Sequence, residues 1–257
     1  MGNTKKQNLS PIDRKIRWRN WLSLTGFTLF IFAAIFFWLK LKNQPLDNDI
    51  AGGVQIPLRK VLNANEKVFS KTFSKQNLAK AYPKSAAAKV VRLNGALGLM
   101  TDLDDKNWRL NVVRAKGDTL KLTLADLQKL PKTQVIFNFK CIEGWSQISD
   151  WAGVRFSDFI KAYHLDKLTD KKYIGLVTPD GEYYVGIDMD SAMQPQTILC
   201  YEMNGKPLPL NQGYPLRLII PVKYGIKSLK RIGVLSFSEE RPPDYWFERG
   251  YDYYAGL

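Results

Sequence analysis

The distribution of apolar residues divides the chain into a long hydrophobic run, a polar stretch and a region of short apolar segments. Residues 21 to 39, WLSLTGFTLFIFAAIFFWL, contain no charged side chain. A helix of this length, at about 1.5 Å per residue, spans roughly the 30 Å hydrocarbon core of a bilayer. Tryptophan lies at both edges of the run, as is common for interfacial anchors. The pattern therefore predicts one transmembrane helix at 21–39, preceded by a basic segment at 1–20.

The polar stretch at 40–88 has too few large apolar residues to form a core of its own. Within it, the segment IPLRKVL at 56–62 is expected to form one short helix. We interpret this stretch as a connector that lies along the following domain.

From Lys89 onward, short apolar runs are rich in Val, Ile, Tyr and Phe and are bounded by Gly, Asp, Asn or Pro, which is typical of strands. Helical patterns are fewer, and the chain has no regular βαβ alternation, GxGxxG motif or P-loop. The sequence therefore predicts an α+β domain at 89–257. The expected strands lie at 89–95, 108–113, 134–139, 172–178, 182–188, 216–222 and 232–237, and the expected helices at 123–130, 153–165 and within 189–203.

The formal charge of +14 is divided equally between two unequal parts of the chain. Residues 1–42 carry eight basic side chains and one acidic side chain, or +7, and the other 215 residues carry 30 basic and 23 acidic side chains, also +7. The domain charge is modest and no nucleic-acid-binding motif is present, so we expect no nucleic-acid partner. The basic residues before the hydrophobic run place the N-terminus in the cytoplasm and the domain on the periplasmic or outer side of the inner membrane. No A-x-A cleavage site follows the run, which favours a retained anchor in contact with lipid.

The two cysteines occupy different surroundings. Cys141 follows an alternating run and precedes a Glu-Gly turn, whereas Cys200 lies within the apolar run TILCYEM. One interpretation is a disulfide between them, as in many exported domains. The other is a site at Cys141 and a buried, inert thiol at Cys200. The only histidine, His164, lies on an amphipathic segment and is expected to be partly exposed, so His-rich metal sites are excluded.

A basic stretch, GYPLRLIIPVKYGIKSLKRIGVLSF at 213–237, is the second candidate for chemistry. Its basic residues either form a solvated strand edge or, with a serine and a glycine turn, form a concavity for a phosphate-bearing ligand.

Together, KCIEGWS, WAGVRFSDFI, LCYEMNGKPLPLNQGYPLRLIIPVKYGIKSLKRI and RPPDYW closely resemble the sulfite oxidase-type molybdopterin oxidoreductases, especially the catalytic subunit of the periplasmic protein-methionine-sulfoxide reductase. The resemblance covers about residues 89 to 247 and implies a sulfite oxidase-like fold with mixed β-sheets and a molybdenum-molybdopterin cofactor. It also implies that Cys141 is the catalytic residue and the one protein ligand to the metal. The other positions that it matches to cofactor binding are Asn94, Thr178, Gln212, Arg217, Ser228, Leu229 and Lys230.

The resemblance implies oxygen-atom transfer, and the short chain favours reduction of an S-oxide-type substrate over sulfite-oxidase-like oxidation. A metal-free, membrane-tethered binding protein with the same fold is the alternative. Exported members normally carry a twin-arginine signal, but this chain has only Arg14-Lys15 and the separated Arg17 and Arg19, so the export route stays open. One histidine cannot supply a bis-histidine haem. We therefore expect a separate membrane redox partner, either a haem-containing cytochrome or a quinone-linked subunit.

Overall fold

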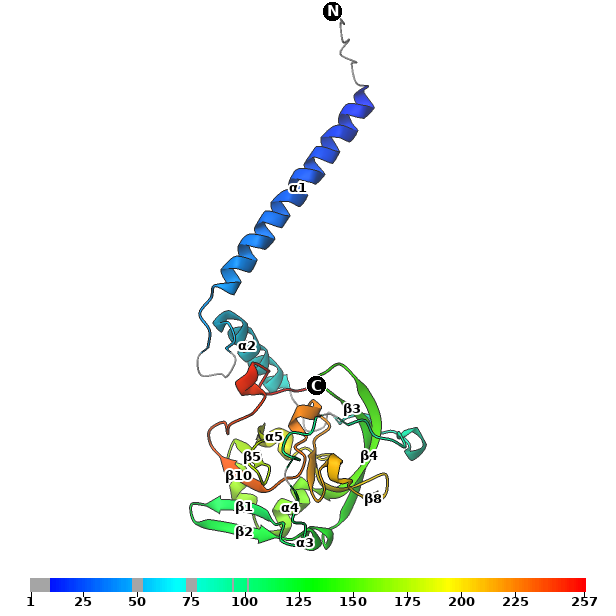
Figure 1. Ribbon diagram of the computed structural model, residues 1–257, viewed down its shortest axis with the longest axis vertical. Coiled ribbons are helices and arrows are strands. Elements are labelled where there is room, and N and C mark those ends of the chain that lie inside the picture. Colours follow the sequence, from blue (N-terminus) through cyan, green and yellow to red (C-terminus); the bar gives the residue numbers. More distant parts are fainter. Residues whose placement is uncertain (1–9, 48–52, 73–77, 94, 101) are drawn as a thin grey trace, which may run out of the picture.

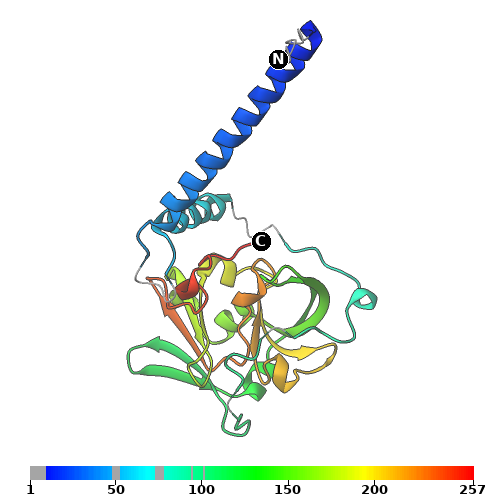
Figure 2. The ribbon, with the colours of Figure 1, turned by 45° about the horizontal axis from the view of Figure 1, so that its top comes forward.

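In a computed structural model, a long helix stands apart from a folded domain, and a second helix lies between the two (Figures 1 and 2). The structure describes residues 10–47, 53–72, 78–93, 95–100 and 102–257.

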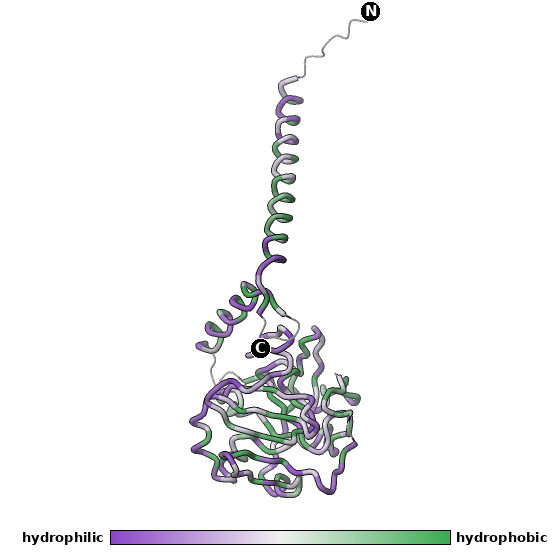
Figure 3. Tube along the Cα trace, turned by 60° about the vertical axis from the view of Figure 1, so that its left-hand side comes forward, coloured by the Kyte–Doolittle hydropathy of each residue, from purple (hydrophilic) through white to green (hydrophobic). Residues whose placement is uncertain are grey.

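The long helix α1 (Pro11–Lys42) contains the predicted membrane span and extends it at both ends. It begins at Ser10, whose hydroxyl accepts a hydrogen bond of 3.1 Å from the Asp13 amide, and proline at the first helical position has no amide to satisfy. A window of this helix has a mean hydropathy of 2.1 and none of it is buried. By length and composition, α1 can therefore cross a membrane. Figure 3 shows its hydrophobic middle between hydrophilic ends.

The second helix, α2 (Ile56–Thr72), is longer than the short helix expected at 56–62, because no glycine or proline interrupts the sequence after Pro57. Its start is held close to the end of α1. The Ile56 amide donates a hydrogen bond of 3.0 Å to the Pro45 carbonyl, and Leu46 forms a β-bridge with Gln55.

Two five-stranded sheets form the domain. In the first, the strand order is β2-β1-β10-β5-β6, and only the β1–β10 pair is parallel among its described pairs. In the second, the order is β3-β4-β7-β8, with β9 also paired to β7, and all described pairs are antiparallel. The first sheet consists of β1 (Leu110–Ala115), β2 (Asp118–Leu122), β5 (Tyr173–Val177), β6 (Tyr184–Asp188) and β10 (Val234–Ser238). The second consists of β3 (Lys132–Lys140), β4 (Ser146–Arg155), β7 (Ile198–Met203), β8 (Lys206–Pro207) and β9 (Arg217–Ile219).

Three short α-helices and five 3-10 helices connect these strands or flank them. The α3 capping box, in which Thr123 and Asp126 exchange hydrogen bonds, confirms the helix start expected at Thr123. The α-helices are α3 (Leu124–Gln128), α4 (Phe156–Ala162) and α5 (Met189–Ala192), and the 3-10 helices are η1 (Lys84–Ala86), η2 (Asp166–Asp170), η3 (Leu210–Gln212), η4 (Gly225–Lys227) and η5 (Phe247–Arg249).

The second sheet is buried on both faces. Along β7, Leu199 and Tyr201 pack into the larger core with residues of the first sheet, whereas Ile198 and Cys200 pack into a smaller cluster on the other side. Alternate side chains of a strand point to opposite faces, so both faces of β7 must be apolar. This arrangement explains why Ile198, Leu199 and Cys200 follow one another without a polar residue between them.

One local prediction was wrong, and two predicted elements are shorter than expected. Described residues in 89–95 form no strand, because their backbone groups pair with side chains instead: the Arg92 amide donates to Gln147 Oε1 at 2.9 Å. The helix expected within 189–203 ends at Ala192, and the rest of that segment becomes β7. The strand expected at 216–222 is reduced to β9.

Candidate active site

Cys141 begins the five-residue loop between β3 and β4 and is only 3% exposed. Its amide donates a hydrogen bond of 2.9 Å to the Trp145 carbonyl, and the Gly144 amide donates one of 3.1 Å back to the Cys141 carbonyl. Gly144 has φ +88°, a conformation that glycine adopts without strain. The paired strands and these two hydrogen bonds therefore hold the Cys141 backbone in one position.

The disulfide interpretation was wrong, because Cys141 and Cys200 are both free, buried thiols. Cys200 lies on β7, and its sulfur is 3.2 Å from the Glu202 carbonyl oxygen. Burial raises the pKa of Cys200 to about 12. The Cys200 thiol therefore stays protonated at neutral pH, as expected for an inert packing residue.

Cys141 lines a cavity of about 120 Å³ together with Ser228 and Lys230. Ser228, Leu229 and Lys230 follow the 3-10 helix η4, so the end of η4 is brought against the β3–β4 loop. Other lining residues are Gly95, Leu97, Ile142, Glu143, Tyr183, Gly225, Ile226, Trp246 and Tyr251. A neighbouring cavity of about 540 Å³ shares Gly95 and contains Arg231, so the segment around Gly95 separates the two.

Arg217 lies beside this cavity and is 1% exposed. Its Nη1 donates to the Gln212 carbonyl and to Gln212 Oε1, both at 3.0 Å, and its Nη2 donates to the Ser228 carbonyl at 3.3 Å. The guanidinium also lies over the Trp151 ring, 4.6 Å from its centroid. All three acceptors are neutral oxygens. Burial therefore lowers the pKa of Arg217 to about 10.

Lys230 is 6% exposed, and its Nζ donates to the Gly95 carbonyl at 2.9 Å. Burial and, to a lesser extent, the charge of Arg217 lower the pKa of Lys230, and Cys141 opposes this shift. The net pKa is about 8. Arg217, Lys223, Lys227 and Arg231 are buried as well. The interpretation of this stretch as a solvated basic edge was therefore wrong: the basic side chains point into the protein.

The remaining candidates lie at different distances from the cavity. Thr178 follows β5 and does not line the cavity, but its hydroxyl contacts the Asp180 carboxylate at 2.5 Å and the carbonyl of the lining residue Tyr183 at 3.1 Å. Leu229 is fully buried in the larger core. Gln212 ends η3 and reaches the site through Arg217. Asn94 lies outside the described residues, although its neighbour Gly95 lines the cavity.

Tyr183 was not among the residues selected from the sequence, where EYYVGID indicated only a strand. Its hydroxyl donates to the Ile226 carbonyl at 2.6 Å and accepts from Trp246 Nε1 at 3.2 Å. Burial, reinforced by Asp244, raises the pKa of Tyr183, so this phenol keeps its proton. The doubled tyrosine beside a Pro-Asp-Gly turn was the available signal, because a strand end next to a turn often places a side chain at a site.

Comparison with known proteins identifies the family of the chain. The family model described as the oxidoreductase molybdopterin binding domain matches residues 97–246. A protein of Azospira oryzae, YedZ1, provisionally described as a protein-methionine-sulfoxide reductase subunit, is 34% identical over 72% of this chain and 70% of that protein.

Two further relatives carry the name protein-methionine-sulfoxide reductase catalytic subunit MsrP. The Campylobacter jejuni protein is 31% identical over 63% of this chain, and the Burkholderia mallei protein is 32% identical over 54%. The matches span 60% and 46% of those two proteins, respectively. The sulfane dehydrogenase SoxCD of Paracoccus pantotrophus shows a partial structural similarity, with a TM-score of 0.48 and 19% identity over 55% of this chain and 40% of that chain.

The family match covers more than half of the chain, and the Azospira relative exceeds 30% identity over more than two thirds of its own length. The chain therefore belongs to the oxidoreductase molybdopterin binding domain family and is a molybdenum-dependent oxidoreductase with a molybdopterin cofactor.

Proposed function

We propose that this chain is the membrane-anchored catalytic subunit of an enzyme that reduces an S-oxide-type substrate, and that Cys141 is its metal ligand. The observation that carries the proposal is the cavity in which Cys141 faces Ser228 and Lys230, with Arg217 behind them. Relatives named as protein-methionine-sulfoxide reductase catalytic subunits support the substrate class.

The residues around the cavity fit a cofactor that combines a metal with an anionic phosphate. Arg217 Nε and Ser228 Oγ are buried and have no hydrogen-bond partner among the residues that the structure describes. Unsatisfied buried donors are rare and costly in folded proteins, so each such donor indicates a missing acceptor. Phosphate oxygens are suitable acceptors for guanidinium, hydroxyl and ammonium groups.

Each candidate residue then has a defined task. The Cys141 sulfur is the soft ligand that would hold molybdenum, which when bound supplies two-electron oxygen-atom transfer. Arg217, Ser228 and Lys230 would bind the phosphate, and Gln212 would orient Arg217. The backbone of Leu229, the Thr178 hydroxyl and Asn94 would contact the pterin.

The cavity at Cys141 is small for such a cofactor, since typical cofactor sites are roughly 300 to 1,000 Å³. The adjacent cavity of about 540 Å³ provides the additional space. We therefore propose that the cofactor extends past Gly95 from one cavity into the other.

Two assays distinguish the two possible directions of the reaction. Reduction of a sulfoxide consumes two electrons and two protons and yields a sulfide and water, whereas oxidation of sulfite releases two electrons. We expect turnover with a methionine sulfoxide peptide and a reduced artificial electron donor. Turnover with sulfite and an artificial acceptor alone would reverse the proposed direction.

The central experiment compares Cys141→Ser with Cys200→Ser in protein produced by a cell that makes molybdopterin. We expect about one molybdenum per chain in the unsubstituted protein, loss of activity in Cys141→Ser and retained activity in Cys200→Ser, because only Cys141 lines the cavity. Metal analysis and activity are measured on the same samples. Molybdenum-free protein from such a cell would favour the alternative of a metal-free binding protein.

A separate membrane protein completes the proposal, as either a haem-containing cytochrome or a quinone-linked subunit. Two features support it: the chain has one histidine, which cannot form a bis-histidine haem site, and α1 can hold the domain at a membrane. The domain would then lie on the periplasmic side of the inner membrane, as the charge distribution around α1 favours.

A further inference from the structure

Helix α2 carries an apolar stripe that is turned away from the domain. Leu58, Val61 and Val68 are 43%, 57% and 58% exposed. Arg59 and Glu66 lie on the domain-facing side, where Arg59 is 5% exposed. At 3.6 residues per turn, positions seven apart share a face, so Val61 and Val68 lie on the side opposite Arg59 and Glu66. Phe69 extends the exposed apolar surface.

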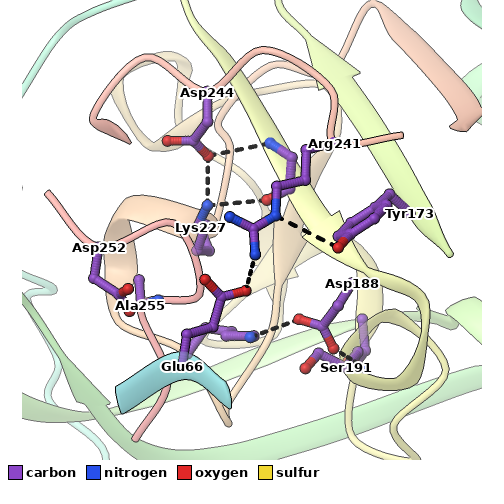
Figure 4. Close-up of polar contacts among 12 residues, drawn as sticks. Glu66, Tyr173, Asp188, Ser191, Lys227, Arg241, Asp244, Asp252 and Ala255 are labelled. Atoms are coloured by element: carbon purple, nitrogen blue, oxygen red, sulfur yellow. Dashed lines mark hydrogen bonds and ion pairs between the residues drawn. The ribbon is translucent and has the colours of Figure 1, made fainter. Parts of the chain in front are cut away.

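The contacts of α2 with the domain make this exposure a fixed feature. Arg59 donates to the Tyr251 carbonyl at 3.0 Å and to the Phe247 carbonyl at 3.4 Å, and its guanidinium lies 4.4 Å from the Phe247 ring centroid. Two turns further on, Glu66 forms an ion pair with Arg241 (Figure 4). Because these polar contacts use the inner face of α2, the apolar face points outward.

The same helix starts beside the end of the membrane-spanning candidate. Only two residues, Asn43 and Gln44, separate Lys42 from Pro45, whose carbonyl accepts the hydrogen bond from Ile56. At about 3.3–3.6 Å per residue, Pro45 lies at most roughly 10 Å from Lys42, and the hydrogen bond holds the start of α2 beside it. Figures 1 and 2 both show α2 between α1 and the domain.

Two exposed lysines flank the stripe. Lys60 and Lys71 are eleven residues apart, about three turns, and share one side of α2. An apolar helical face with lysines along its border is typical of a helix that lies in the interface of a bilayer with anionic lipids.

We propose that α2 is such an interfacial helix. Leu58, Val61, Val68 and Phe69 enter the headgroup layer of the bilayer that α1 crosses, and Lys60 and Lys71 contact lipid phosphates. The inference rests on the proposed membrane anchoring and not on the cofactor chemistry.

This arrangement fixes which side of the domain faces the membrane. Arg59 holds the segment that includes Tyr251, and Tyr251 and Trp246 line the cavity at Cys141. The interfacial helix therefore sets the orientation of the active-site wall relative to the bilayer.

The test uses the full chain in vesicles of phosphatidylethanolamine and phosphatidylglycerol. Val61→Cys and Val68→Cys place a fluorescent label on the stripe, and Asn63→Cys places one on an exposed position near the domain-facing side as the matched control. Cys141 and Cys200 are buried, and unsubstituted protein measures their background labelling. With lipids brominated near the headgroup, we expect several-fold stronger quenching at positions 61 and 68 than at 63.

A charge variant checks the lipid contacts. Combined Lys60→Glu and Lys71→Glu should reduce quenching at position 61 in these anionic vesicles and have little effect in vesicles of phosphatidylcholine alone. Equal quenching at all three labelled positions would overturn the proposal. Shielding of the stripe from water-soluble quenchers only in native membranes, and not in lipid vesicles, would assign it to a protein partner and also overturn the proposal.

Two measurements on the same samples separate this inference from the proposed function. Molybdenum content and turnover with an artificial donor report on the catalytic site, whereas resistance to carbonate extraction reports on α1. Loss of the quenching difference in extraction-resistant, molybdenum-containing protein contradicts only the interfacial helix.

Discussion

At the scale of single residues, the burial of Arg217 and Lys230 near Cys141 is the least expected finding. In the site described above, both side chains donate hydrogen bonds to neutral oxygens. Burial of a cation beside neutral acceptors is unfavourable, so this arrangement is suited to a ligand that brings negative charge.

The first prediction concerns cofactor retention. Lys230→Ala should weaken cofactor binding by about 2 to 4 kcal/mol, or roughly 30- to 700-fold in Kd, because a buried charge-assisted contact is lost. Arg217 is a less clean target, since its hydrogen bonds to Gln212 and Ser228 also support the fold. Molybdenum remaining after dialysis and the melting temperature of cofactor-free protein are compared with those of Lys121→Ala, an exposed lysine on β2. Equal loss of apo stability and cofactor would make Lys230 a structural residue.

The second prediction is a pH dependence. The pKa of Lys230, about 8, lies below its ordinary value, so in the empty site the ammonium is charged below about pH 8 and neutral above it. Binding of an anion requires the charged form, and cofactor affinity should fall as the pH rises through about 8. Lys230→Arg keeps its charge over this range and should flatten the profile. A fall of the same size in Lys230→Arg would assign the titration to another group.

At the scale of elements, a buried ion pair joins η4 to the C-terminal segment. Lys227 and Asp244 are 1% and 2% exposed, and Asp244 also accepts hydrogen bonds from the amides of Gly186 and Phe247 (Figure 4). Burial lowers the pKa of Lys227, and Asp244 opposes this shift. The pair therefore connects the loop that carries Ser228 to the segment that carries Trp246.

The third prediction follows from this pair. Asp244→Asn leaves a buried charge without compensation and should lower the free energy of unfolding by about 3 to 5 kcal/mol. Glu239→Gln removes the carboxylate of the exposed Lys172–Glu239 pair and should change stability little. Urea denaturation of both variants measures the difference, and similar effects would mean that Asp244 is not a structural anchor.

Sequence patterns predicted the elements that bury one face or carry a recognisable cap. The α3 start at Thr123 and the strand ending near Cys141 are examples. The patterns failed for strands that are buried on both faces and for segments whose backbone groups form hydrogen bonds with side chains. β4 contains Asp150 and Gly153, which argue against a strand, yet Asp150 is buried and accepts from Gln134 Nε2 at 2.7 Å. Val90 and Val91 lie in a segment without regular secondary structure, and their carbonyls accept hydrogen bonds from Gln147 and Gln212.

The candidate site shows the same division. Cys141, Ser228 and Lys230 were selected from sequence and lie together around one cavity. Tyr183, Trp246 and Tyr251 were not selected as site residues, because distant segments bring them there and no local spacing reports such contacts. The burial of Arg217 could not be predicted from the sequence, because a solvent-exposed strand edge with basic residues shows the same sequence pattern.

At the scale of the whole molecule, the proposal divides the electron path between this chain and a membrane partner. The fourth prediction is that purified protein has no haem absorbance, turns over with artificial electron carriers and uses quinol only after a membrane partner is added. Absorption spectra and quinol-driven assays with and without partner membranes measure this. Stoichiometric haem in the isolated chain, or quinol-driven turnover without another protein, would contradict it.

The hydrogen bond between Ile56 and Pro45 has a consequence for how such partners meet. The 13 residues between α1 and α2 would reach roughly 45 Å if extended, but this contact brings their two ends together. An extended connector would let the domain sample many positions and orientations around the end of α1. In the proposed anchored state, the closed connector keeps the domain close to the membrane surface. Encounters with the proposed partner would then depend on the number of molecules of the two proteins per membrane area and not on their amount per volume of solution.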